Sequence, residues 1–93
     1  MTVLAQDFLM RFPEFQSLTQ DYIELILDES KAELNEVIWD KQYRAGVLFL
    51  SADTLALSPL GEAARLVPGD GMTTYRQEFE RLRRIVSAGF LVA

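Results

Sequence analysis

The sequence predicts a small all-α domain, a bundle of about four helices with a C-terminal helix and an apolar tail. Three observations predict this: apolar residues recur at helical spacing in four stretches, proline or glycine punctuates these stretches, and apolar residues form 49% of the 93 residues. A chain of this length forms one domain, residues 1–93. Within it we expect a helical core over 1–57, a loop over 58–74, and a C-terminal helix with a docking tail over 75–93.

The first helix is predicted over residues 3–12, with Thr2 as a candidate N-cap. Pro13 should end it, because the residue before a proline is pushed out of the helical region. Phe15, in the short connection that follows, is expected to fill the core. The apolar face of this helix, at positions i, i+4 and i+8, consists of Leu4, Phe8 and Phe12.

The second helix is predicted over residues 20–34, with Thr19 as its N-cap. Asp21 and Glu24 lie in its first turn, where the helix dipole favours negative charge. The three apolar residues that follow its end, 37–39, are expected to form a compact apolar knot. The predicted buried stripe of the helix consists of Tyr22, Ile23, Ile26, Leu27, Ser30 and Leu34.

The third helix is predicted from an N-cap at Asp40 to about Leu57, where Pro59 and Gly61 stop it. Leu48 and further leucines widen its apolar surface well beyond one stripe. A helix that is apolar on so much of its circumference is central in a bundle or is covered by a partner. Its predicted stripe consists of Tyr43, Val47, Leu50, Thr54 and Leu57, widened by Leu48 and Leu55.

The fourth helix is predicted over residues 74–86, stabilised by Arg76–Glu80 and Glu80–Arg84 pairs at i, i+4. Gly89 is expected to supply a left-handed C-cap. The apolar tail that follows, 90–93, either folds back onto the core or docks on another chain. We favour docking, because the four helices already supply enough apolar side chains for a core of this size. The apolar face of the helix consists of Tyr75, Phe79, Leu82 and Val86.

The residue types present argue against catalysis. The chain contains no cysteine and no histidine, which excludes disulfides and Cys-based metal sites and removes the commonest general base. The acids on one face of the second helix (Asp21, Glu24, Asp28) lack any supporting ligand and are expected to be solvated. Ser51 and Tyr75 have no plausible base near them in the sequence. We therefore predict a protein that is not an enzyme, with no catalytic residue, no cofactor and no metal.

The charge of the chain is acidic and unevenly distributed. Fourteen acidic and nine basic residues give a net charge of −5, which disfavours binding of DNA through its phosphates. Most acids precede residue 37, whereas residues 75–93 hold four arginines and two glutamates. These faces are either ordinary solvated surfaces or complementary surfaces that meet across a subunit boundary. No signal peptide or membrane-spanning stretch is expected, so we predict synthesis in a cytoplasm and no membrane contact.

The arginines near the C-terminus are the predicted binding residues. Arg81, Arg83 and Arg84, with Phe79 and Phe90, are compatible with a protein interface, with nucleic acid, or with a solvated face. We favour a protein interface, because the guanidinium group pairs with carboxylates and its stem packs on apolar surface. The full predicted interface consists of Tyr75, Arg76, Phe79, Arg81, Arg83, Arg84, Phe90, Leu91 and Val92.

Several blocks of the sequence resemble one protein family. Residues 8–15 read Phe-Leu-Met-Arg-Phe-Pro-Glu-Phe and resemble the F-x-x-R-F-P-E-F opening of short tailed-phage head–tail connector proteins, also called adaptor or head-completion proteins. Where relatives often carry a longer Gly/Ser-rich insertion, this chain has only residues 58–74. The resemblance touches most of the chain in order and continues through residues 25–32, 39–40, 55–61, 75–84 and 89–92.

The resemblance implies a structural role in the virion. Such proteins form a ring of identical subunits, typically a dodecamer, beneath the portal protein, where they extend the DNA channel and join the head to a tail-side neck or tail-completion protein. The C-terminal segment commonly reaches the portal, which here implies residues 75–93. DNA would pass through the channel without sequence-specific binding, and the protein would be made in the host bacterial cytoplasm and end in the virion neck. The alternative is a small acidic phage regulatory or inhibitor module that binds a host protein.

Overall fold

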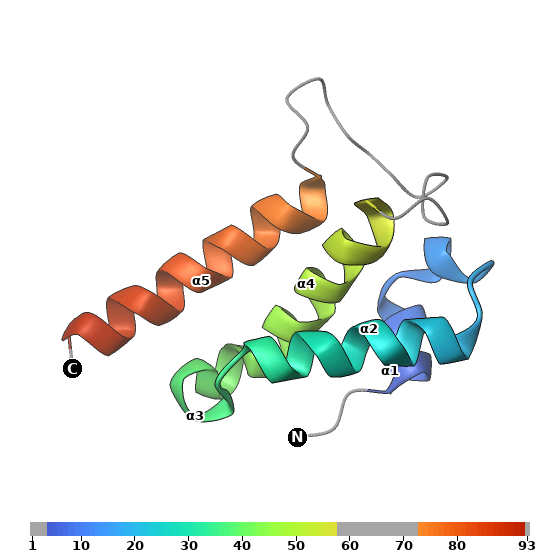
Figure 1. The fold of residues 1–93 in the computed structure, drawn as a ribbon. Helices are drawn as coiled ribbons and strands as arrows, with labels where there is room; N and C mark the ends of the chain where they lie inside the picture. Colours follow the sequence, from blue (N-terminus) through green and yellow to red (C-terminus); the bar gives the residue numbers. More distant parts are fainter. Residues whose placement is uncertain (1–3, 58–72, 93) are drawn as a thin grey trace.

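The computed structural model describes residues 4–57 and 73–92, and for 89–92 only the backbone. All regular elements of the described residues are helices or 3₁₀ turns and none is a strand, which confirms the predicted all-α class (Figure 1). Thr2 and most of the predicted 58–74 loop lie outside the described residues. The elements are α1 (Ala5–Arg11), η1 (Pro13–Phe15), α2 (Gln20–Glu33), α3 (Glu36–Trp39), η2 (Asp40–Gln42), α4 (Tyr43–Leu57) and α5 (Thr74–Val92), where η denotes a 3₁₀ turn.

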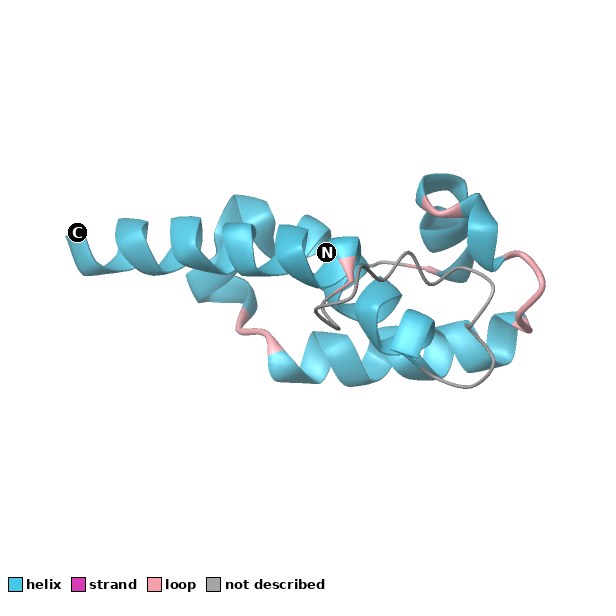
Figure 2. Ribbon diagram, turned by 90° about the horizontal axis from the view of Figure 1, so that it is seen from above, coloured by secondary structure: helices cyan, strands magenta, loops and turns pink. Residues whose placement is uncertain are grey.

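Helix α4 is the centre of the bundle, which is the first of the two alternatives that its wide apolar surface left open. Helices α2 and α5 both pack on it, and Figure 2 shows α2 along one side of the molecule and α5 along the other. The prediction that Thr54 and Leu57 belong to its buried stripe is wrong, because both are exposed. Small side chains at Ser51, Ala52 and Ala56 are buried in their place and let the neighbouring helices approach closely. The buried residues of α4 are Tyr43, Gly46, Val47, Leu48, Leu50, Ser51, Ala52, Asp53, Leu55 and Ala56.

An aromatic cluster joins the N-terminal turn of the chain to α4 and α5. Phe15 is 1% exposed, which confirms that it fills the core. The ring of Phe12 lies at its centre, with centroid distances of 5.2 Å to Phe8, 5.3 Å to Phe49 and 5.4 Å to Tyr75. Such tilted and edge-on arrangements suit the quadrupoles of aromatic rings. The cluster therefore links residues that lie far apart in the sequence.

The boundaries of α1 and α2 follow local signals. Helix α1 ends before Pro13 as predicted, and at its start the Asp7 carboxylate accepts a hydrogen bond of 3.0 Å from the Leu4 N–H. Thr19 caps α2 as predicted, because its hydroxyl accepts from the Tyr22 N–H at 3.2 Å. The predicted stripe of α2 is confirmed: Ile23, Ile26, Leu27 and Ser30 are buried, and Tyr22 and Leu34 are partly buried.

The segment between α2 and α4 differs from the prediction. Asp40 is not the N-cap of α4; it adopts a positive φ of 46° and begins η2, and α4 begins at Tyr43. A helix starts earlier, because the side chain of Asn35 accepts from the backbone N–H of Val37 (2.9 Å) and of residue 38 (3.0 Å). Of residues 37–39, which the sequence marked as an apolar knot, only Trp39 is buried, because within one helical turn only one of three consecutive side chains faces the core.

Helix α5 is longer than predicted. Thr73 caps its start, where its hydroxyl accepts from the Arg76 N–H at 2.9 Å. The predicted cap at Gly89 is wrong, since the backbone stays helical to Val92. Glycine can adopt helical dihedrals at a cost of about 1 kcal/mol, and no proline follows to enforce a stop. The helix therefore extends past the bundle at its C-terminal end (Figures 1 and 2).

A substitution at Gly46 tests how closely α4 packs against Trp39 and Leu34. A Cβ at residue 46 would lie 2.6 Å from Cζ3 of Trp39 and 3.1 Å from Cδ1 of Leu34. We expect Gly46→Ala to destabilise the fold by about 1–2 kcal/mol, because the overpacking outweighs the gain of about 1 kcal/mol in helix propensity. Urea unfolding followed by circular dichroism measures the change. Combining it with Trp39→Leu removes the ring and should reduce the cost; an alanine variant more stable than wild type would contradict this packing.

Candidate partner-binding surfaces

The arginines of α5 are mostly paired within their own helix. Arg81 Nε donates to both carboxylate oxygens of Glu78, at 3.0 and 3.1 Å, and Arg83 Nη2 lies 2.7 Å from Oε1 of Glu80. Hydrogen bonds from Arg81 and Arg83 lower the pKa of Glu78 and Glu80, respectively. Both arginines are more than half exposed. They present fixed guanidinium groups at the surface, with much of their charge already balanced.

The two predicted i, i+4 pairs of α5 have different outcomes. Arg76 Nη2 lies 3.2 Å from Oε2 of Glu80, which confirms the first. The second is wrong, because Glu80 pairs with Arg83 at i+3 in place of Arg84. Arg76 also reaches the buried carboxylate of Asp53 at 3.7 Å. Arg84 is exposed, and no carboxylate of the described residues forms an ion pair with it.

Two residues of the predicted interface belong to the core. Tyr75 and Phe79 are each 5% exposed. Phe79 stacks on Trp39 with a centroid distance of 5.4 Å and an interplanar angle of 17°. The Tyr75 hydroxyl donates a 2.5 Å hydrogen bond to Glu14, and burial followed by this bond raises the pKa of Tyr75 above its ordinary value. In this structure both side chains hold α5 to the bundle and offer no surface to a partner.

The apolar tail continues α5. The backbone of residues 87–92 is helical, whereas the side chains of Phe90, Leu91 and Val92 lie outside the described part of the structure. A tail that extends the helix does not turn back as a separate segment. Of the two alternatives for the tail, this backbone course fits docking on another chain better than folding back.

A shallow apolar hollow lies where α3 meets α5. Val37 is 87% exposed, Ile38 43% and Ile85 45%, and Trp39 and Val86 line the hollow beside them. The sequence interpretation missed this surface because it described residues 37–39 only as an apolar knot and did not assign a direction to each side chain. The Asn35 cap is the signal that identifies it, since a cap there starts a one-turn helix that cannot bury three consecutive residues.

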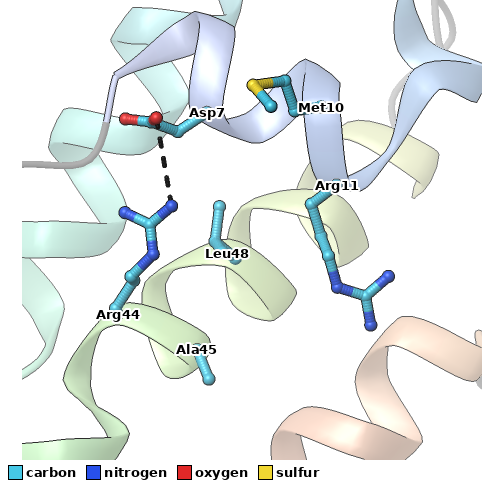
Figure 3. A pocket seen from close by; sticks show the side chains of 6 residues that line it. All are labelled: Asp7, Met10, Arg11, Arg44, Ala45 and Leu48. Atoms are coloured by element: carbon cyan, nitrogen blue, oxygen red, sulfur yellow. Dashed lines mark ion pairs between the residues drawn. The ribbon is translucent and has the colours of Figure 1, made fainter.

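A second hollow, which we call the α1–α4 groove, carries two arginines (Figure 3). Arg44 lies 3.9 Å from Asp7, and the Arg11 guanidinium lies over the rings of Phe12 and Phe49, 5.0 and 5.3 Å from their centroids. Sequence reasoning missed it, because helical spacing can group the α1 residues but no local signal brings α4 beside them. Its lining residues are Asp7, Met10, Arg11, Arg44, Ala45 and Leu48.

Buried polar groups in the described chain serve structure. The Ser51 hydroxyl donates to Ser30 at 2.9 Å, and the Thr73 hydroxyl donates to Asp53 at 2.7 Å. Residues 4–57 and 73–92 contain no cluster of three or more metal-ligating side chains. No helix within these ranges is long and apolar enough to cross a membrane.

Comparison of the chain with protein-family models, with curated proteins and with solved structures found no match. The resemblance to phage connector proteins thus stays a prediction from the sequence. Binding experiments on the surfaces of α5 and of the α1–α4 groove can test it.

The Tyr75–Glu14 bond predicts a pH dependence. A phenol whose pKa is raised in the folded state contributes stability that is fully present below its unfolded pKa of about 10 and is lost as the pH rises toward the folded value. We expect Tyr75→Phe to cost about 1 kcal/mol at neutral pH and to make the alkaline loss of stability less steep. Urea unfolding between pH 7 and about 11 tests this.

Tyr22→Phe is the matched control for the loss of folding stability at neutral pH. It should cost less than Tyr75→Phe, since Tyr22 is only partly buried. Equal stability of wild type and Tyr75→Phe at neutral pH, together with the same alkaline slope, would show that the bond to Glu14 does not contribute.

Proposed function

We propose that this chain is a head–tail connector (adaptor) subunit of a tailed phage. It would form a ring of identical subunits beneath the portal protein, extend the DNA channel and join head to tail. The ordered resemblance along the sequence supports this proposal, and the all-helical fold agrees with what that resemblance implies. A role as a structural subunit also accounts for a chain without histidine or cysteine.

The observation that carries the proposal is the course of α5. Its first half is packed into the bundle by Tyr75, Phe79 and Leu82, and its last turns extend beyond the other helices (Figure 1). Exposed Arg84 and Ile85 lie just before this extension. A projecting helix with an arginine and an aliphatic side chain suits insertion against a large partner, since arginine and apolar groups dominate the centres of interfaces.

The charge of the chain supports the rest of the proposal. A net charge of −5 would let DNA slide through a channel without adhering to its wall. Of the alternatives for the α5 arginines, a contact with nucleic acid is the less favoured, because Arg81 and Arg83 are already paired with glutamates. We therefore assign these arginines to the portal contact.

The alternative is a small acidic phage regulatory or inhibitor module that binds a host protein. The exposed acids of α2, among them Asp21, Asp28 and Glu29, favour it, since they could cover a basic host surface. Electron microscopy of the chain mixed with purified portal separates the two functions. Stoichiometric rings support the connector, and their absence favours the inhibitor.

Removal of the helix extension tests the portal contact. We expect a chain lacking residues 87–93 to keep its helical circular dichroism spectrum but to lose detectable binding to portal from the same phage, because it lacks the projecting turns. Co-sedimentation with portal measures binding. The double variant Arg81→Glu/Arg84→Glu should weaken it at least tenfold, since reversed charges repel the partner surface.

Ser17→Ala is the matched control, since Ser17 is exposed in the turn between η1 and α2 and belongs neither to α5 nor to the α1–α4 groove. It should bind portal as wild type does. Portal binding retained by the folded truncation would refute the assignment of this contact to the end of α5.

A further inference from the structure

We propose that the α1–α4 groove binds the outer face of α2 from a second copy of this chain, so that copies associate head to tail. This contact deepens the proposed function, on which its place in a ring rests, by naming the two surfaces that join neighbouring subunits. The contact itself can be tested in the absence of portal.

The groove offers two cations on either side of an apolar floor. Figure 3 shows the guanidinium groups of Arg11 and Arg44 flanking Leu48 and Ala45, with Met10 above them on α1. Met10 is 83% exposed. An exposed methionine adapts its shape to a partner, and an aliphatic floor between cations suits an apolar side chain that carries acids around it.

Both arginines keep charge available for an external carboxylate. Arg11 is held over the rings of Phe12 and Phe49, and within the described chain no carboxylate forms an ion pair with it. The carboxylate of Glu78 feels Arg11, which contributes to lowering its pKa, but its direct partner is Arg81. Among the residues that the structure describes, Arg44 has one ion pair, with Asp7, whose separation of 3.9 Å makes it weak.

The outer face of α2 has the matching chemistry. Leu25 is 53% exposed, on the side of α2 opposite the buried Ile23 and Leu27. Asp21, Asp28 and Glu29 lie three or four residues from Leu25 and therefore surround it on the same face. Asp28 is 75% exposed at its side chain and lies 3.6 Å from Lys31, so it remains free to take another partner. We call these four residues the α2 acidic face.

Shape and charge place the α2 acidic face in the groove. Leu25 projects from a helix and is ringed by acids, and the floor of Leu48 is a hollow flanked by arginines. The described residues that line the groove come from α1 and α4, so one copy can receive a neighbour there and still present its own α2. Such a heterologous contact generates a closed ring or an open filament.

The arginines of α5 are a poorer match for the α2 acidic face. Arg81 and Arg83 are neutralised by Glu78 and Glu80 one turn away, whereas the groove holds two cations against the single Asp7. The assignment therefore leaves α5 for a different partner. It also makes the two contacts separable by mutation.

Crosslinking tests the contact directly, because the chain has no cysteine of its own. Met10→Cys carrying an affinity tag is mixed with Leu25→Cys and treated with a short bis-maleimide. We expect a tagged heterodimer in severalfold greater yield than with the control Val37→Cys, whose position is 87% exposed and lies outside both surfaces. Equal yields from Leu25→Cys and Val37→Cys, or no heterodimer from either, overturn the proposal.

Charge reversal in the full-length chain gives a second measurement. Arg44→Glu and Asp28→Lys should each lower the association constant about tenfold in sedimentation equilibrium, and the double variant should regain most of it, because the reversed charges again oppose each other. Lys41→Glu is the control, since Lys41 is exposed and lies outside both surfaces, and it should associate as wild type does. Single reversals without effect, or no recovery in the double variant, overturn the proposal.

Each of the two proposals can be refuted without refuting the other. A chain that crosslinks through Met10 and Leu25 but does not bind portal retains the subunit contact and refutes the connector function. A chain that binds portal through α5 but gives no specific crosslink retains the connector function and refutes this contact.

Discussion

The burial of α4 is the constraint on which the rest of the structure depends. A helix with leucine, valine and alanine around most of its circumference must be covered on all those sides, and in a chain of 93 residues only a few helices can cover it. Helices α2 and α5 do so from two sides. The two polar groups buried on α4, Ser51 and Asp53, are satisfied by Ser30 and Thr73, so each covering helix is also fixed in register by a hydrogen bond.

This arrangement divides α5 into two parts with different tasks. The part near Thr73 is held by the aromatic contacts of Tyr75 and Phe79, whose rings complete the core. Trp39 takes part in this packing from α3, and its ring occupies the space that a side chain at residue 46 would need. The last turns of α5 have no such covering helix, since α4 is already enclosed. A projecting helix end is thus a consequence of how the core closes, and the proposed portal contact makes use of it.

The same packing decides which charged side chains are paired and which are exposed at the surface. Within α5, Arg81 and Arg83 each pair with the glutamate three residues before them. This pairing makes the two arginines less able to attract other anionic groups. In the α1–α4 groove, aromatic rings hold Arg11 and leave its charge without an ion pair among the described residues. The acids of α2 face outward because its apolar residues are taken up by α4. The molecule therefore presents acidic and basic surfaces on different elements, which is the arrangement that polar, directional assembly needs.

The sequence by itself determined the helical class, the wide apolar surface of α4, the Thr19 cap, the end of α1 at Pro13 and the burial of Phe15, since each depends on helical periodicity or on local backbone chemistry. It also led to the prediction that the C-terminal helix binds a partner. Only the tertiary structure decided that Tyr75 and Phe79 are core residues, because burial of an apolar stripe depends on what packs against it. The groove of Arg11 and Arg44 likewise joins residues 33 positions apart, and no local signal encodes that meeting. The exposure of Val37 could not be predicted for the same reason: apolar character is a property of the residue, but the direction it faces is decided by the turn that carries it and by the helices around it.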